Sequence, residues 1–89
     1  MAQKEEPQLL SELDRAKQKV EIGAHYFNYK NPGQIYTVLE IGFNEATEEI
    51  SVVYKAEYGE GLVWIRTLNV FTEKVEVDGN EVDRFTKIV

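Results

Sequence analysis

Residues 50–67 decide the fold: Ile50-Ser51-Val52-Val53-Tyr54-Lys55-Ala56-Glu57-Tyr58-Gly59-Glu60-Gly61-Leu62-Val63-Trp64-Ile65-Arg66-Thr67. Two runs rich in β-branched and aromatic residues flank Gly59-Glu60, a pair that suits a type II′ turn, so the stretch predicts a β-hairpin. With Tyr58 opposite Gly61, Tyr54 pairs with Ile65 and Lys55 pairs with Trp64. Side chains alternate between the two faces of a strand, so one face is expected in the core. That core face carries Val52, Tyr54, Ala56, Val63 and Ile65, and the outer face carries Val53, Lys55, Leu62, Trp64 and Arg66.

The outer face of this hairpin allows two interpretations, and a register slip of one residue would exchange the faces. In the first, Trp64 and Arg66 bind a ligand, because indole offers an aromatic face and guanidinium a planar fork for carboxylate or phosphate. In the second, Lys55 covers Trp64 and only stabilises the hairpin, through a cation–π contact of about 0.5–1 kcal/mol.

The flanking sequence predicts a small, mainly β domain with an N-terminal α-helix. After a frayed tail at 1–6, residues 7–20 have apolar residues at helical spacing, with Pro in the first turn and Gly23 as a stop. Strands are expected at 25–30 and 35–43 around a turn at 31–34, followed by an acidic loop at 44–49. A helical turn at 68–73 precedes short strands around the tight turn Asp78-Gly79. On the second strand, one face is expected to carry Ile35, Thr37, Leu39, Ile41 and Phe43.

Five or six short strands joined by tight turns predict a small SH3-like β-barrel, because closing a sheet removes exposed edges. An open antiparallel sheet with the helix across one face is the alternative. We expect residues 1–22 to form the tail and helix and residues 23–89 to form the β domain. The helix is expected to cover the barrel, and a homodimer through the helix is the alternative to a monomer.

Composition narrows the classes of function. The 89 residues contain no Cys, which excludes disulfides and zinc–thiolate sites and fits a cytoplasmic protein. No signal peptide or membrane span is predicted. The net charge is −6, and residues 40–89 hold eleven of the 16 acids but five of the 10 bases. This balance disfavours a nucleic-acid binder, which needs a basic face.

The sequence offers little for catalysis. The single His25 has no Cys to pair with, and neither Ser11 nor Ser51 lies in a nucleophile-elbow context. The acids of loop 44–49 do not match a calcium-binding loop and are interpreted as a solvated turn. We therefore predict no catalytic residue, no metal ligand and no cofactor.

Several short segments between residues 23 and 88 share a distinctive order of aromatic and Arg residues. They are Tyr26-Phe27-Asn28-Tyr29-Lys30-Asn31-Pro32, Ile35-Tyr36, Val52-Val53-Tyr54-Lys55, Leu62-Val63-Trp64-Ile65-Arg66, Phe71, Asp78-Gly79 and Arg84-Phe85. These segments resemble DUF1653, a bacterial family of small domains of unknown function. The resemblance departs at three positions, where Asn28, Thr67 and Val70 stand for the family's common His, Pro and Met. The matching positions are Tyr29, Lys30, Tyr36, Tyr54, Trp64, Arg66, Phe71, Arg84 and Phe85.

We interpret the chain as a non-catalytic binding or interaction module with an aromatic and cationic surface. Its partner would be an unidentified protein, a peptide or a small anionic ligand. Alternatives are a small enzyme or enzyme accessory acting on an anionic metabolite and, less favoured, a nucleic-acid binder. Against all of these stands the simpler hypothesis that the Arg side chains pair with surplus acids and the Tyr rings pack the core. The candidate ligand-binding residues are Lys30, Tyr36, Tyr54, Trp64, Arg66 and Arg84.

Overall fold

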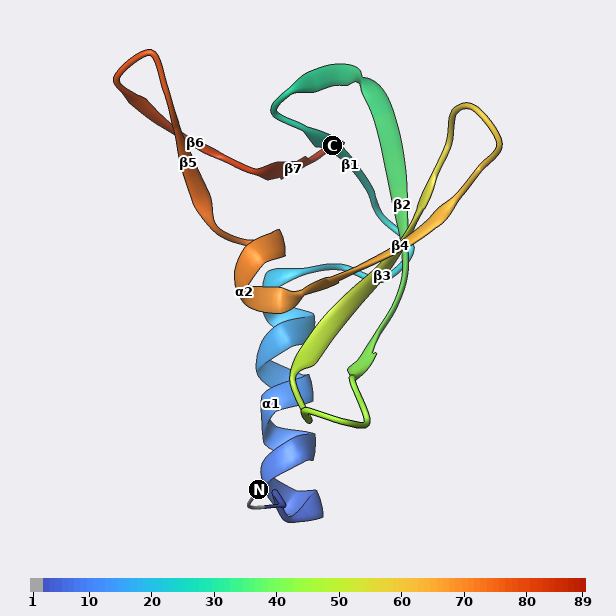
Figure 1. Ribbon diagram of the computed structural model, residues 1–89, viewed down its shortest axis with the longest axis vertical. Coiled ribbons are helices and arrows are strands. Elements are labelled where there is room, and N and C mark those ends of the chain that lie inside the picture. Colours follow the sequence, from blue (N-terminus) through green and yellow to red (C-terminus); the bar gives the residue numbers. More distant parts are fainter. Residues whose placement is uncertain (1–2) are drawn as a thin grey trace.

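The computed structural model describes residues 3–89 and shows an N-terminal helix packed against an antiparallel sheet (Figure 1). The five-stranded sheet has the order β4-β3-β2-β1-β7, and β5 and β6 form a separate hairpin that projects away from it. The elements are α1 (Glu6–Lys19), β1 (His25–Asn28), β2 (Asn31–Phe43), β3 (Ile50–Ala56), β4 (Val63–Thr67), α2 (Leu68–Phe71), β5 (Lys74–Val77), β6 (Asn80–Asp83) and β7 (Phe85–Lys87).

The predicted class, mainly β with an N-terminal helix, is confirmed. Every strand pairing is antiparallel, and β4 and β7 form the two edges of the larger sheet. Within residues 3–89, β4 and β7 do not pair with each other, so the sheet is not closed into a barrel. None of the helices in this range combines the length and apolar character needed to cross a membrane.

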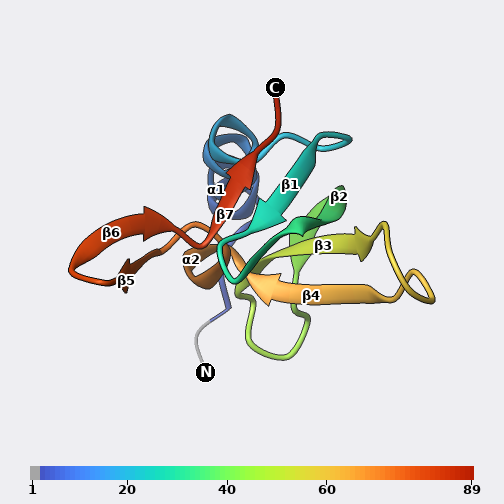
Figure 2. The ribbon, with the colours of Figure 1, turned by 90° about the horizontal axis from the view of Figure 1, so that it is seen from above.

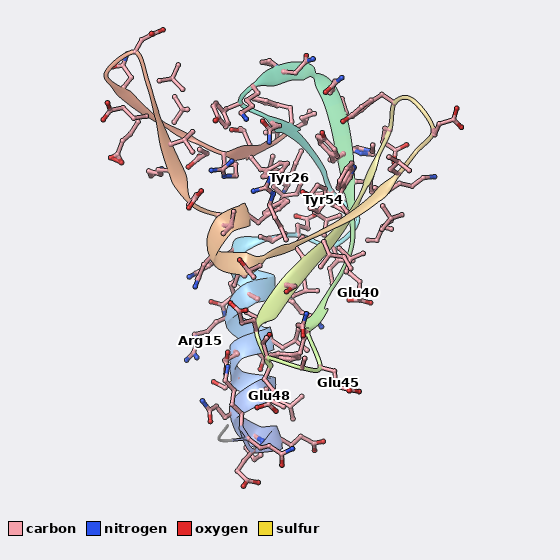
Figure 3. All side chains as sticks on the ribbon, viewed as in Figure 1. Arg15, Tyr26, Glu40, Glu45, Glu48 and Tyr54 are labelled. Carbon is pink, nitrogen blue, oxygen red and sulfur yellow. The ribbon has the colours of Figure 1, made fainter. Side chains whose placement is uncertain are left out.

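The core lies between α1, α2 and one face of the sheet. Phe71 of α2 stacks on Phe85 of β7, with ring centroids 4.2 Å apart and planes within 6°. The rings of Tyr26 and Tyr54 meet Phe71 edge-on, which places both tyrosines in the centre of the molecule (Figure 3). Each buried large side chain stabilises the fold by about 1.5–3 kcal/mol. The buried cluster comprises Ala16, Val20, Tyr26, Val38, Ile41, Val52, Tyr54, Leu68, Phe71 and Phe85.

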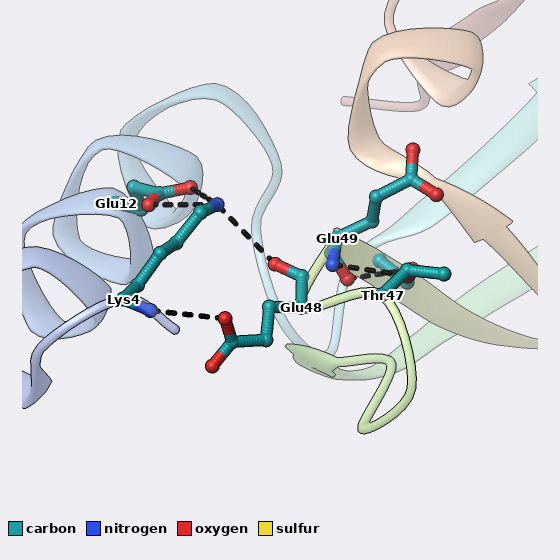
Figure 4. A network of polar contacts seen from close by, with 6 residues as sticks. Lys4, Glu12, Thr47, Glu48 and Glu49 are labelled. Atoms are coloured by element: carbon teal, nitrogen blue, oxygen red, sulfur yellow. Dashed lines mark hydrogen bonds and ion pairs between the residues drawn. The ribbon is translucent and has the colours of Figure 1, made fainter. Parts of the chain in front are cut away.

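Helix α1 agrees with its prediction to within one residue at each end. Pro7 lies in its first turn, and the amide of Val20 donates to the carbonyl of Ala16 as the helix ends. Residues 1 and 2 of the expected frayed tail lie outside the described residues. Lys4 is not frayed, because its Nζ bonds Glu12 at 3.1 Å and its backbone N–H donates to Glu48 Oε1 at 3.0 Å (Figure 4). These contacts tie the start of the helix to the acidic loop between β2 and β3.

The turn between β1 and β2 lies earlier than predicted. Asn28 pairs with Asn31, so the turn consists of Tyr29 and Lys30, and the predicted turn residues 31–34 belong to β2. The cause is local: Asn28 Oδ1 accepts a 2.9 Å hydrogen bond from the amide of Lys30. An Asn side chain that binds the backbone two residues ahead mimics a turn.

A β-bulge at Leu39 changes which residues of β2 face the core. Val38 pairs with Tyr54 and Glu40 with Val53, so one extra residue lies between these pairs. Val38 and Ile41 are therefore both buried although they are three residues apart, and Leu39 is 42% exposed. The predicted shared face of Ile35 to Phe43 is wrong, because a bulge re-phases the alternation.

The register of β3 and β4 also differs by one residue from the prediction. Tyr54 pairs with Trp64 and Val52 with Arg66, instead of with Ile65 and Thr67. The hydrogen bond of the expected turn is present, from Gly61 N to Tyr58 O. However, Gly61 has φ of 69° and acts as an extra bulged residue, so that Ala56 N bonds Leu62 O. This shift places Trp64 and Arg66 on the face of Tyr54 and turns Val63 and Ile65 outward.

The last third of the chain follows the prediction more closely. Leu68–Phe71 form the expected helical turn, capped by the hydroxyl of Thr67. Asp78 and Gly79 both have positive φ, as a tight turn of this kind requires, and they join β5 to β6. Arg84 separates β6 from β7, and its amide donates to Glu73 O.

Candidate binding pocket

A hollow of about 180 Å³ opens on the sheet beside the edge strand β4. We call it the aromatic pocket. It is built from five strands, because β1, β2, β3, β4 and β7 each contribute at least one side chain. The lining residues are Asn28, Tyr36, Tyr54, Trp64, Arg66 and Phe85. The pocket thus combines four aromatic rings with one cation and one amide.

The aromatic walls hold one another in place. Tyr36 contacts Tyr54 and Phe85 edge-on, with centroid distances of 5.4 and 5.8 Å. Tyr54 in turn meets Phe85 at 5.3 Å. Such edge-to-face pairs add about 0.5–1.5 kcal/mol each beyond the burial of their surface. Because Tyr54 and Phe85 are also buried in the core, this side of the pocket is rigid.

Among residues 3–89, Arg66 is the one cation that lines the pocket, and it forms no ion pair. Its Nε donates a hydrogen bond to the hydroxyl of Tyr54 at 3.3 Å. Among residues 3–89, no carboxylate lies within 4.0 Å of its guanidinium. Neither β4, which carries Arg66, nor the adjacent strand β3 contains an Asp or Glu that could supply a carboxylate. A partly buried Arg with free N–H groups beside aromatic rings is suited to bind a carboxylate.

The hydroxyl of Tyr36 forms a second polar feature at this pocket. It lies 2.6 Å from the hydroxyl of Tyr58, in the loop between β3 and β4. Burial, this hydrogen bond and the proximity of Tyr58 raise the pKa of Tyr36 to about 12, although Arg66 acts in the opposite direction. Tyr36 therefore stays neutral at physiological pH and can donate or accept a hydrogen bond, but cannot act as a base there.

Trp64 forms the open side of the pocket and is 48% exposed. The predicted contact between Lys55 and Trp64 is wrong, because the register shift puts Lys55 opposite Val63 on the other face. The indole is therefore available to a ligand on the same side as Arg66 and Tyr54.

Two of the six candidate residues lie outside the pocket. Arg84 bonds Glu73 through both Nε and a terminal nitrogen, and its guanidinium lies 5.8 Å from the ring centroid of Tyr29. Arg84 is therefore paired with an acid inside the molecule, as the simpler of the two hypotheses for the Arg side chains predicted. Lys30 is exposed in the turn between β1 and β2. The structure thus brings together Tyr36, Tyr54, Trp64 and Arg66 of the candidate set.

Two pocket residues were not among the candidates. Phe85 follows Arg84 in the final segment, and it was noted only as a position matching DUF1653. Asn28 was noted as a departure from that family, at the position where His is common. Its place in the pocket depends on the pairing of β1 with β7, a contact between distant segments that no local pattern indicates.

The single His lies on the surface, and not in a cleft as a catalytic base would. His25 is exposed, and its Nδ1 lies 2.9 Å from the hydroxyl of Thr37, which donates to Glu57 at 2.7 Å. His25 lies on β1, Thr37 on β2 and Glu57 just after β3, and both hydrogen bonds are exposed to solvent. Among residues 3–89, no three His, Asp or Glu side chains are grouped closely enough to hold a metal ion.

The fold and pocket define a small mainly β domain with an aromatic, cation-bearing hollow at one sheet edge. Residues 24–87 match the family described as protein of unknown function (DUF1653), and the chain belongs to this family. A similar solved structure is a DUF1653 protein from Bordetella bronchiseptica, with 29% identity and a TM-score of 0.69. The alignment covers 80% of this chain and 90% of that chain. No match was found among curated proteins.

The family positions gather around the pocket. Five of the nine matching positions line it, namely Tyr36, Tyr54, Trp64, Arg66 and Phe85. A sixth, Phe71, stacks on Phe85 directly behind it. Six of the nine matching residues therefore build the pocket and its support, whereas Tyr29, Lys30 and Arg84 lie outside it.

Proposed function

We propose that this domain of unknown function is a non-catalytic binding module whose aromatic pocket receives a planar anionic group, above all a carboxylate. The observation that carries the proposal is the unneutralised Arg66 among aromatic rings, in a chain with a net charge of −6. Other bases, such as Arg15 and Lys55, also have no ion pair within residues 3–89. What distinguishes Arg66 is its partly buried position in a hollow that is lined by aromatic rings and by no acid.

The same pocket disfavours a cationic ligand. Three or four aromatic rings around a hollow can bind an ammonium group through cation–π contacts. Here the guanidinium of Arg66 shares the hollow and repels a second cation. A carboxylate would instead accept hydrogen bonds from its free N–H groups while a planar substituent packs on Trp64. The volume of about 180 Å³ admits one side chain or a small acid rather than a larger ligand.

Charge-matched small molecules test this proposal. The chain has a single Trp, so one indole N–H signal in a ¹⁵N-labelled sample reports on the pocket directly. We expect benzoate to shift that signal and the Arg66 Nε–H signal in a saturable way, and we expect benzylammonium to leave both unchanged. Arg66→Gln should abolish the response to benzoate, whereas Lys55→Gln, on the opposite face, should preserve it. Equal responses to the two compounds would reject the proposal.

The finer fold assignment is also a proposal. The strand order β4-β3-β2-β1-β7, with α2 between β4 and the later strands, is the order of an SH3-like barrel, which supports an open variant of that fold with β5–β6 as an insertion. A bacterial origin is supported by the organism of the similar structure, and a cytoplasmic location by the absence of Cys.

A further inference from the structure

The edge strand β4 has an unpaired outer side within residues 3–89. Natural edges are generally short, charged, kinked by Pro or a bulge, or covered, because unpaired backbone groups invite another strand. The opposite edge, β7, has three residues and ends in Lys87, whose Nζ donates to Glu21 in the segment that follows α1. In contrast, β4 is five residues long, contains no Pro, and has no other element of residues 3–89 beside its free side (Figure 2).

The hydrogen-bond pattern identifies which backbone groups are free. Ala56 N donates to Leu62 O at 2.9 Å, and bonded pairs alternate along an antiparallel ladder. The pairs Tyr54–Trp64 and Val52–Arg66 are therefore the bonded ones. It follows that the N–H and C=O groups of Val63 and Ile65 point away from β3, toward the empty side of the strand.

The side chains of β4 present different chemistry on its two faces. On the pocket face lie Trp64 and the unneutralised Arg66. On the other face lie Val63, 53% exposed, and Ile65, 68% exposed. A strand added beside β4 would place alternate side chains next to these two sets. An acidic residue is complementary to the first face and a β-branched apolar residue to the second.

The charges near β4 favour an acidic segment over a second copy of this chain as the added strand. Strands β3 and β4 contain Lys55 and Arg66 and no acid, although the whole chain has six more acids than bases. A second copy of β4 brings the same cation and gains no charge complementarity. An extended acidic segment of another protein gains it at Arg66.

We propose that β4 is a docking edge for an extended segment of a partner protein in which acidic and β-branched apolar residues alternate. The segment adds as a sixth strand, bonds the free backbone groups of Val63 and Ile65, and inserts a carboxylate side chain beside Arg66. This inference rests on the proposed carboxylate pocket and names its ligand as a polypeptide bound through its main chain.

Backbone-modified peptides test the inference without altering the protein. The probe is an acetylated and amidated heptapeptide, Gly-Val-Glu-Val-Glu-Val-Gly, titrated into the full chain and followed by amide hydrogen exchange. We expect protection of the Val63 and Ile65 amides, together with the shift of the Trp64 indole. N-methylation of the peptide at the positions bonded to β4 should weaken binding about tenfold or more, because backbone hydrogen bonds are lost. N-methylation at the alternate, outward positions should change it less than about twofold.

The outcomes separate this inference from the pocket proposal. If the peptide shifts the Trp64 indole but both methylation patterns bind equally, the pocket stands and strand addition is overturned. If benzoate and the peptide both fail to bind, both proposals are overturned. Replacing Glu by Lys in the peptide should remove binding, and retention of affinity would overturn the role of Arg66. As a second variant, Ile65→Pro loses no bond to β3 and should block the peptide while benzoate still binds.

Discussion

Arg66 and Tyr54 lie on the same face of adjacent strands, and Arg66 Nε donates a 3.3 Å hydrogen bond to the Tyr54 hydroxyl. This bond uses one of the five N–H groups of the guanidinium and fixes its plane against the pocket wall. The remaining donors have no carboxylate of residues 3–89 within 4.0 Å. A buried tyrosine of the core therefore contacts and orients a cation that forms no ion pair within residues 3–89.

Arg66 and Arg84 should contribute differently to stability. Arg84 forms charge-assisted bonds to Glu73 and has a largely buried side chain, so Arg84→Gln should lower the free energy of unfolding by about 1.5–3 kcal/mol. Arg66→Gln removes one bond to a neutral hydroxyl and should cost less than about 1 kcal/mol. Urea denaturation of the two variants measures the difference. A loss for Arg66→Gln as large as that for Arg84→Gln would make Arg66 a structural residue.

The stability of the domain should fall in strong alkali because of Tyr36. Its pKa is raised from 10.0 to about 12 in the folded chain, first by burial and then by the bond to Tyr58. The folded state therefore holds this proton more tightly than the unfolded state does. The stabilisation that the protonated Tyr36 hydroxyl gives the folded state is fully present below pH 10 and is lost as the pH rises through 12. Tyrosinate absorbance should show a late-titrating component, and Tyr36→Phe should remove it. A Tyr36→Phe titration identical to that of the unchanged protein would contradict this assignment.

The sequence predicted what depends on local signals. The helix, the turn at Asp78-Gly79 and the existence of the hairpin follow from residue spacing and from residues that accept positive φ. The strand registers were not predictable in this way. Gly59-Glu60 suits a two-residue turn, but Gly61 at φ 69° adds a bulge, and the same letters permit both arrangements.

The candidate site shows the same division. Counting aromatic and cationic residues selected four of the six residues that line the pocket. The predicted register nevertheless separated Tyr54 from Trp64 and Arg66, and only the shifted register joins them. The pairing of Arg84 with Glu73 could not be predicted from the sequence either. The packing of β7 near α2 determines which base lies next to which acid.

The role of Gly61 in the register gives a direct prediction. A side chain at its φ of 69° is strained, and an added Cβ would lie 3.1 Å from Cε of Lys55. Gly61→Ala should therefore lower the free energy of unfolding by about 1–2 kcal/mol. Gly42→Ala is the matched control, since its backbone is unstrained and nothing lies within 4 Å of an added Cβ. Thermal unfolding of both variants compares them, and equal midpoints would show that the bulge does not depend on Gly61.

We expect the full chain to sediment as a monomer, which decides between the two states that the sequence left open. The apolar stripe of α1 is used inside the molecule, where Ala16 and Val20 are buried against the sheet and α2. Of the large apolar side chains in the helix, Leu10 is the exposed one, at 54%. A single such residue is ordinary for a protein surface and does not make a stable interface. Leu10→Gln should leave the sedimenting mass unchanged, whereas a dimer that this substitution dissociates would establish the helix as the contact.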